Sequence, residues 1–336
     1  MKARIVLLVV ALTLALTAGA AHEAPAEEIK LRFAQITPAA HPYYSHISQP
    51  WAQEIEKRTQ GRVKITLYPA GALVAGNVMY KSTVSGITDI GTSSFGWERG
   101  RHPLMSAFTY VPGFNSAKTA VKVANETVAK IKPKELSDTH LLFIHACAPM
   151  HIWSKRPVRT LEDLKGLEVR AAGPTGKLVK YLGGVPISAT QGQAYEMLSK
   201  GIVKASISSL DVLKGFRQAE VVKHVTLAYF HVAPFFVSMN RDKWSSLPPD
   251  IQEVFTQVSQ EYIDIAGGVW DRASAAGLEY AKEQGLEIIE LPDQERARWH
   301  AAYAPLRDEY VKDMAAKGLD GKGFLETIEA VTKKYQ

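Results

Sequence analysis

The chain has 336 residues, 46% hydrophobic and 22% charged, which suits about two domains of roughly 150 residues and excludes a disordered or collagen-like chain. Its one cysteine, Cys147, excludes an internal disulfide framework and a multi-cysteine zinc site. The formal net charge is +6, but the cations are scattered among acids, and the densest group, 155–159, holds three of them. This mixed pattern predicts no nucleic-acid partner.

The N-terminus has the pattern of a secretory signal peptide. Lys2 and Arg4 precede an apolar run from Ile5 to Leu16, and small residues follow it. We expect the signal peptide to occupy residues 1–26, with cleavage after Ala20 or Ala26. Because no later apolar run approaches the roughly 20 residues that span a bilayer, we predict an exported protein with no stable membrane insertion after cleavage.

Strand-like and helix-like segments alternate along the rest of the chain, which predicts an α/β protein. The expected strands are 29–35, 63–68, 89–92, 141–146, 167–171, 205–208, 224–229 and 235–240. The expected helices are 43–59, 73–85, 118–131, 175–182 and 193–200, with a helical turn at 161–164. Everything after residue 240 is expected to be helical.

One of the expected helices is unusually long. It runs from about residue 251 to 284, interrupted in sequence only by glycines such as Gly277. Such a helix is roughly 50 Å long, which is more than one domain needs. We therefore expect it to span both domains.

The motifs of several enzyme and cofactor classes are incomplete. Lys177 lies in GPTGKL, but Ala171 and Leu178 replace the first glycine and the final Ser or Thr of a phosphate loop. No G-x-G-x-x-G follows the first strand and no G-x-S-x-G occurs, so we expect neither a dinucleotide cofactor nor a serine hydrolase. His145, Cys147 and His151 come nearest to a metal cluster, but no carboxylate lies near them in sequence. We predict no cofactor, no metal site and no enzymatic activity.

Arg170 is the best candidate for a functional residue. It ends the expected strand of TLEDLKGLEVRAAG, at the edge where open α/β sheets bind ligands. Its planar guanidinium suits bidentate binding of a carboxylate. A surface arginine paired with Glu168 or Glu162 is an equally good interpretation from these residues alone.

The sequence resembles the extracytoplasmic solute-binding proteins of tripartite ATP-independent periplasmic (TRAP) transporters. The resemblance covers nearly the whole mature chain and is carried, in order, by KLRFAQITPAAHPYY, RVKITLYPAGAL, DLKGLEVR, LGGVPISATQGQAYEMLSKGIV and FFVSMNRDKWSSLPPDIQEVF. It implies a two-lobed, type II-like periplasmic binding protein with mixed sheets and a long helix spanning both lobes. It also implies a cleft that closes on an organic acid, with Arg170 on the carboxylate. We expect one lobe at 27–147 and 236–277, the other at 148–235 and 278–336, and the ligand between them.

Some positions depart from the family pattern. Met150 stands where sialic-acid-binding members carry a second arginine, Lys204 replaces an aspartate, and Ser208 replaces an asparagine. These departures favour a less polar ligand, such as an aromatic or branched carboxylate. The residues expected to contact it, besides Arg170, are Phe95, Trp97, Gln35, His41, Ser94, Met150, Trp153, Ser208, Asp211 and Phe235.

The resemblance implies the membrane subunits of a TRAP permease as partners, which would receive the ligand from this protein. Three alternatives remain open at this point. One is a sensor that presents its bound form to a signalling receptor, and another is an exported α/β enzyme. The third is a binding protein for an ATP-driven importer, which the TRAP-like motifs disfavour.

Overall fold

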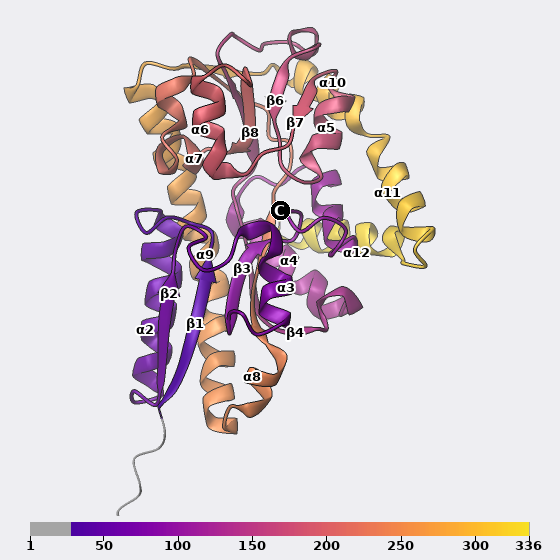
Figure 1. Ribbon diagram of the computed structural model, residues 1–336. Coiled ribbons are helices and arrows are strands. Elements are labelled where there is room, and N and C mark those ends of the chain that lie inside the picture. The colour runs from indigo at the N-terminus through magenta and orange to yellow at the C-terminus, as the bar shows by residue number, and fades with distance from the viewer. Residues whose placement is uncertain (1–27, 336) are drawn as a thin grey trace, which may run out of the picture.

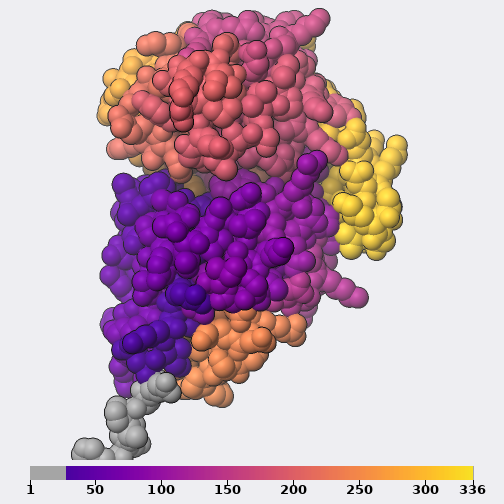
Figure 2. Space-filling view, in the orientation of Figure 1, coloured from indigo at the N-terminus to yellow at the C-terminus, as the bar shows by residue number. Residues whose placement is uncertain are grey.

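Two mixed β-sheets, one in each of two lobes, form the framework of the computed structural model, which describes residues 28–335 (Figure 1). The lobes stack end to end and meet along a narrow boundary (Figure 2). This architecture confirms the two-lobed α/β fold expected from the sequence. The expected signal peptide at 1–26 lies outside the described residues.

The first lobe is built on a sheet with the strand order β2-β1-β3-β10-β4. Its strands are β1 (Ile29–Gln35), β2 (Val63–Tyr68), β3 (Ile90–Ser94), β4 (Thr139–Ala146) and β10 (Pro234–Asn240). Strand β1 is parallel to β2 and β3, whereas β10 is antiparallel to β3 and β4. The carboxyl ends of β1 and β3 therefore lie at the same edge of the sheet.

The second lobe contains a sheet with the strand order β11-β9-β5-β8-β6-β7. Its strands are β5 (Met150–Ser154), β6 (Glu168–Arg170), β7 (Val185–Ile187), β8 (Ala205–Ser209), β9 (His224–Leu227) and β11 (Glu287–Glu290). Strand β6 is parallel to β7 and β8, and β5 is antiparallel to β8 and β9. Arg170 is the last residue of β6, as the sequence predicted.

Helices cover both faces of each sheet (Figure 1). The α-helices are α2 (Gln49–Arg58), α3 (Met79–Val84), α4 (Ala117–Ile131), α5 (Thr175–Tyr181), α6 (Gln191–Ser199), α7 (Asp211–Gly215), α8 (Arg241–Ser246), α9 (Pro249–Glu283), α10 (Asp293–Tyr303), α11 (Leu306–Ala315) and α12 (Gly321–Tyr335). Short π or 3-10 turns are η1 (Tyr44–Ser48), η2 (Gly76–Val78), η3 (Leu104–Tyr110), η4 (Lys134–Leu136), η5 (Leu161–Leu164) and η6 (Gln218–Val221).

The alternation of apolar side chains along the strands decides which helices each face contacts. Leu31 and Phe33 of β1 pack in one cluster with Trp51 of α2 and Phe255 of α9. On the opposite face, Phe236 of β10 packs in the cluster that contains Val121, Ala124 and other buried residues of α4. Burial of these apolar surfaces is the main force that holds the first lobe together.

Two chain segments cross between the lobes side by side. One joins β4 to β5, the other joins β9 to β10, and backbone hydrogen bonds link them. Cys147 N–H donates to the carbonyl of Ala233 (3.1 Å) and Met150 N–H to that of His231 (2.8 Å). The paired segments form a two-stranded hinge.

Helix α9 is the third connection, and its 35 residues run along both lobes (Figure 1). Its first half packs on α2 and β4, and its second half packs on α7. The long helix expected from the sequence is therefore present, and its bounds agree within two residues.

Three short strands were not predicted from the sequence, namely β5, β7 and β11. The expectation that everything after residue 240 is helical is wrong at β11, which pairs in parallel with β9. The expected lobe boundaries also differ from the packing at the C-terminus. They place 278–336 in the second lobe, whereas α12 packs on α4 and η3 of the first.

Within residues 28–335 no helix has both the length and the apolar character that a membrane span requires.

Candidate functional site

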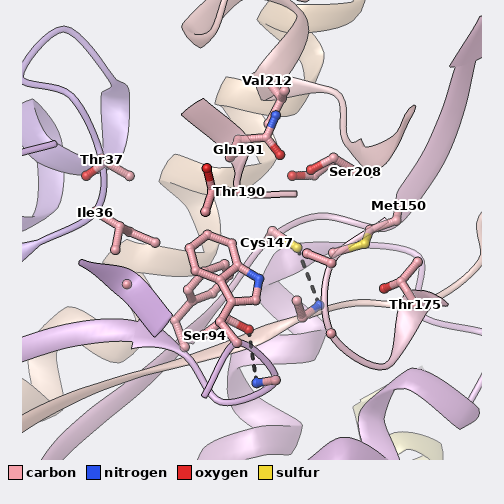
Figure 3. A pocket seen from close by; sticks show the side chains of 18 of the residues that line it. Ile36, Thr37, Ser94, Cys147, Met150, Thr175, Thr190, Gln191, Ser208 and Val212 are labelled. Carbon is pink, nitrogen blue, oxygen red and sulfur yellow. Dashed lines mark hydrogen bonds between the residues drawn. The ribbon is translucent and has the colours of Figure 1, made fainter. Parts of the chain in front are cut away.

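A cavity of about 720 Å³ lies between the two sheets. Figure 3 shows Gln191, Ser208 and Val212 of the second lobe across the cavity from Ile36, Thr37 and Ser94 of the first. Its walls come from the ends of β1, β3, β6, β7 and β8, from both hinge segments, and from Trp270 of α9. Because both lobes contribute, opening the hinge would take the cavity apart.

Arg170 is buried at this cavity, with 2% of its surface exposed. Its Nε donates to the carbonyl of Ala189 (3.1 Å) and its Nη1 to Oε1 of Gln191 (2.7 Å). Burial lowers the pKa of the guanidinium to about 10, so Arg170 is still charged at neutral pH. No carboxylate within residues 28–335 forms a salt bridge with it, which excludes the expected alternative of a surface arginine paired with Glu168 or Glu162.

Two buried donors next to each other lack acceptors. Nη2 of Arg170 and Nε2 of Gln191 have no hydrogen-bond partner in the described part of the chain. The Gln191 amide orientation is fixed, because its Oε1 accepts from Arg170 and a guanidinium only donates. Since unsatisfied buried donors are costly, this end of the cavity is suited to a group with two acceptor oxygens.

His41 and Asp211 meet across the lobe boundary. Nε2 of His41, which follows β1, lies 3.1 Å from Oδ2 of Asp211, the first residue of α7, and both side chains are buried. The His41 ring also lies against Trp270 and Phe216, with centroid distances of 5.5 and 6.1 Å. This contact holds the two lobes together at one side of the cavity.

Aromatic rings form much of the cavity wall. Trp97 meets Phe235 edge-on at a centroid distance of 5.9 Å. On its other side Phe235 stacks on His145 at 4.9 Å, and His145 Nδ1 accepts a hydrogen bond from Nε1 of Trp270 (3.1 Å). Such a wall favours a flat or branched apolar group.

Burial keeps several of the other titratable groups of the cavity neutral at neutral pH. It lowers the pKa of His145 well below its usual value and that of His231 to about 4. It raises the pKa of the Cys147 thiol to about 12. These side chains therefore add no charge to the site.

The structure brings most of the predicted residues to the cavity. Those that line it are Arg170, Phe95, Trp97, His41, Ser94, Met150, Ser208, Asp211 and Phe235. Phe95 is also almost fully buried in the core of the first lobe, against Phe236 and His102.

Two predicted residues, Gln35 and Trp153, do not line the cavity. Gln35 shares the α2 face of β1 with Phe33, and its Oε1 accepts from Ser48 (2.9 Å) inside the first lobe. Trp153 points into the core beneath the second sheet, where its Nε1 donates to Gln218 (2.8 Å). Strand alternation turns the Gln35 side chain away from the cleft. Trp153 is in register with Arg170 through Ser206, but it lies three residues along β5 from Met150, which borders the cavity, and it is covered by the core of the second lobe.

Sequence reasoning missed Gln191 and Trp270. Gln191 follows β7 at the carboxyl edge that also carries Arg170, so the rule that singled out Arg170 also applies to it. Trp270 lies far along the chain within α9 and has no local signal. Among residues 28–335 no group of His, Cys, Asp and Glu side chains is placed to hold a metal ion, and His145 and His151 belong to different sheets.

The chain matches the profile of a protein family described as "Bacterial extracellular solute-binding protein, family 7" over residues 33–313. The protein belongs to this family. Its relatives include the 2,3-diketo-L-gulonate-binding periplasmic protein YiaO of Escherichia coli, which is 25% identical over 290 residues, 82% of this chain and 84% of the relative.

Solved structures of TRAP periplasmic solute-binding proteins share the fold. One from Desulfovibrio salexigens is 34% identical and superposes with a TM-score of 0.82 over 92% of this chain and 97% of that chain. Another, from a marine metagenome, is specific for aromatic acids and was solved with 3-hydroxybenzoate. It is 24% identical, with a TM-score of 0.88 over 92% of this chain and 99% of that chain. The protein is thus a TRAP-type solute-binding receptor, and the two-lobed frame around the cavity is that of its family.

Proposed function

We propose that this protein captures a small organic acid between its lobes and delivers it to the membrane subunits of a TRAP permease. The observation that carries the proposal is the pair of adjacent buried donors, Nη2 of Arg170 and Nε2 of Gln191. A carboxylate has two acceptor oxygens and a negative charge, so it would satisfy both donors and pair with the guanidinium.

The aromatic wall supports an acid with an aromatic or branched body. Trp97, Phe235 and Trp270 offer flat apolar surfaces to such a group. A relative of similar fold is specific for aromatic acids, which agrees with this proposal.

Binding would be coupled to closure of the lobes. Arg170 and Gln191 belong to the second lobe, whereas Trp97 and Ser94 belong to the first. A ligand between them contacts both lobes only when they are closed, and it thereby shifts the population toward the closed form. The permease would then recognise the closed form.

The proposed site of action is the periplasm, reached by export and by cleavage of the signal peptide after Ala20 or Ala26. Family membership supports this location, because relatives of the same family are periplasmic binding proteins. The proposed role is transport, with no reaction catalysed.

A thermal-shift screen of the mature protein tests the proposal. The panel contains mono- and dicarboxylates, aromatic acids, keto acids and sugar acids, each with the neutral amide of the same skeleton. A ligand that binds only the folded state raises Tm, so we expect a shift with an acid and none with its amide. A shift with neutral or cationic solutes only would overturn the carboxylate proposal.

A further inference from the structure

Three polar atoms of cavity-lining side chains are buried without a hydrogen-bond partner in residues 28–335, and they differ in kind. Nη2 of Arg170 and Nε2 of Gln191 are donors, whereas Oδ1 of Asp211 is an acceptor. The carboxylate of the proposed ligand would satisfy the two donors. It would leave the Asp211 oxygen unsatisfied, since a carboxylate has no hydrogen to donate.

The ring and backbone donors around His41 already have acceptors other than Oδ1 of Asp211. The backbone N–H of Tyr43 donates to Nδ1 of His41 (3.1 Å), so Nδ1 is the unprotonated nitrogen of the ring. Nε2 of His41 therefore carries the hydrogen, and it donates to Oδ2 of Asp211. Nε1 of Trp270, which packs on the same histidine, donates to His145.

The wall on the His41 side of this pair is apolar, whereas Ser208 and Ser209, which precede Asp211, line the cavity with polar side chains. Phe216 and Trp270 pack on His41, and Val212 follows Asp211 along α7. Asp211 is 4% exposed, so bulk water has little access to its carboxylate. A buried carboxylate oxygen without a donor is unfavourable, and a group that supplies a hydrogen at this position gains a strong, charge-assisted bond.

We propose that the ligand is a carboxylic acid with a second, protic group, either a hydroxyl or an ammonium, which donates a hydrogen bond to Oδ1 of Asp211. This inference rests on the proposed function, because it takes Arg170 and Gln191 as the binding site of the carboxylate. Asp211 then determines specificity. It disfavours an acid without a donor and repels the second carboxylate of a dicarboxylate.

Isothermal titration calorimetry with matched probes tests the inference. One set is phenylacetate, mandelate and phenylglycine, and a second is isovalerate, 2-hydroxyisovalerate and valine. A third set is benzoate, 3-hydroxybenzoate and 3-aminobenzoate. With the wild-type protein we expect, within the set that binds, about ten- to hundredfold tighter binding of a member with a donor than of the plain acid. Comparison of the hydroxyl and amino members shows which donor the site takes.

Asp211→Asn provides the matched variant. Its amide oxygen can still accept from His41, but an NH₂ group replaces Oδ1, so the preference for the donor-bearing acid should disappear or reverse. The neutral amide also weakens the contact with His41 that holds the lobes together, so the plain acid is expected to lose some affinity, but less than the donor-bearing acid. Binding of the plain acid also shows that the variant is folded.

Equal or tighter binding of plain acids by the wild type would overturn the inference, and that comparison needs no variant. An equal loss of affinity in Asp211→Asn for the plain acid and for the donor-bearing acids of a set would also overturn it. If no acid of any kind binds, the proposed function fails together with this inference. If acids bind without regard to the second group, only this inference fails.

Discussion

Gly277 of α9 lies directly against the backbone of Leu210, at the start of α7. A Cβ atom at Gly277 would be 1.9 Å from the carbonyl oxygen of Leu210. Ten residues earlier, a Cβ at Gly267 would be 2.6 Å from Cα of Lys118 in α4. The long helix therefore touches the backbone of both lobes at positions where only glycine fits.

Gly277→Ala should lower the free energy of unfolding by about 1–3 kcal/mol, because the new methyl group forces α9 away from α7. This loss outweighs the gain in helix propensity of about 1 kcal/mol. Gly268→Ala is the control on the same helix, since its nearest neighbour is the flexible end of Arg272 at 3.3 Å, and it should be neutral or stabilising. Urea denaturation of both variants measures the difference. A Gly277→Ala protein as stable as Gly268→Ala would show that the close approach is not rigid.

Gln191→Glu should imitate a bound acid. Nη1 of Arg170 already lies 2.7 Å from Oε1 of Gln191, so a glutamate there would pair with the buried guanidinium. We expect a higher Tm for the unliganded variant and no thermal shift with acids that stabilise the wild type. A variant that still binds those acids with wild-type affinity would contradict the placement of the carboxylate at this pair.

Arg170→Ala should weaken acid binding about thirtyfold or more, because truncation of a buried charge pair typically costs about 2–5 kcal/mol. Arg170→Lys keeps a charge but loses the planar fork, so it should also bind more weakly than the wild type. Arg159→Ala is the control, since this exposed arginine pairs with Glu287 away from the cavity. Calorimetric measurement of Kd compares the three variants with the wild type. Unchanged affinity in Arg170→Ala would show that Arg170 does not bind the carboxylate.

Trp97→Ala should weaken benzoate binding about two- to tenfold, since an aromatic pair contributes about 0.5–1.5 kcal/mol beyond the area it buries. The affinity of the variant for isovalerate, which has no ring, should fall by less. Trp244→Phe is the control, because Trp244 stacks on His140 and does not line the cavity. Equal losses for benzoate and isovalerate would exclude ring stacking as the reason.

Stability should fall on acidification below about pH 6.5. Burial lowers the pKa of His151 to about 3 and that of His231 to about 4 in the folded protein. Their pKa in the unfolded chain is about 6.5, so unfolding takes up protons as the pH falls toward the folded values. Each of these histidines then lowers the free energy of unfolding by about 1.4 kcal/mol per pH unit below 6.5, or by about 2 kcal/mol at pH 5.

Glu135 opposes this trend, because burial raises its pKa to about 6 and its protonation favours the folded state. Denaturation at pH 7.5 and pH 5.0 measures the net effect, in which we expect the histidines to dominate. His151→Gln should reduce the difference between the two pH values. Equal stability at both would contradict the neutral, buried state of these side chains.

The sequence predicted the elements that have a strong local pattern. The alternation in β1 and β2, the periodicity of α9, and Arg170 at the end of β6 are examples. The strands it missed lack such a pattern. Strand β7 has three residues and includes Pro186, and β11 has four residues and gains its partner only when β9 lies beside it.

The candidate site was predicted where a strand end or the family resemblance marked it. Strand alternation, applied to Gln35, would have placed it with Phe33 on the α2 face and away from the cleft. Trp270 enters the cavity only because α9 packs across the lobe boundary, which is a tertiary contact without a sequence signal. The pairing of His41 with Asp211, 170 residues apart, is likewise a tertiary contact that no local sequence pattern marks.

Cys147, the chain's one thiol, lies in the hinge segment at the cavity wall, where its Sγ accepts from the N–H of Ala233 (Figure 3). It is 2% exposed, and burial also holds it in the unreactive, protonated form. We therefore expect a thiol reagent to react mainly with molecules whose lobes have parted. The rate of Cys147 labelling would then report how often the native chain opens, and a bound solute should slow it.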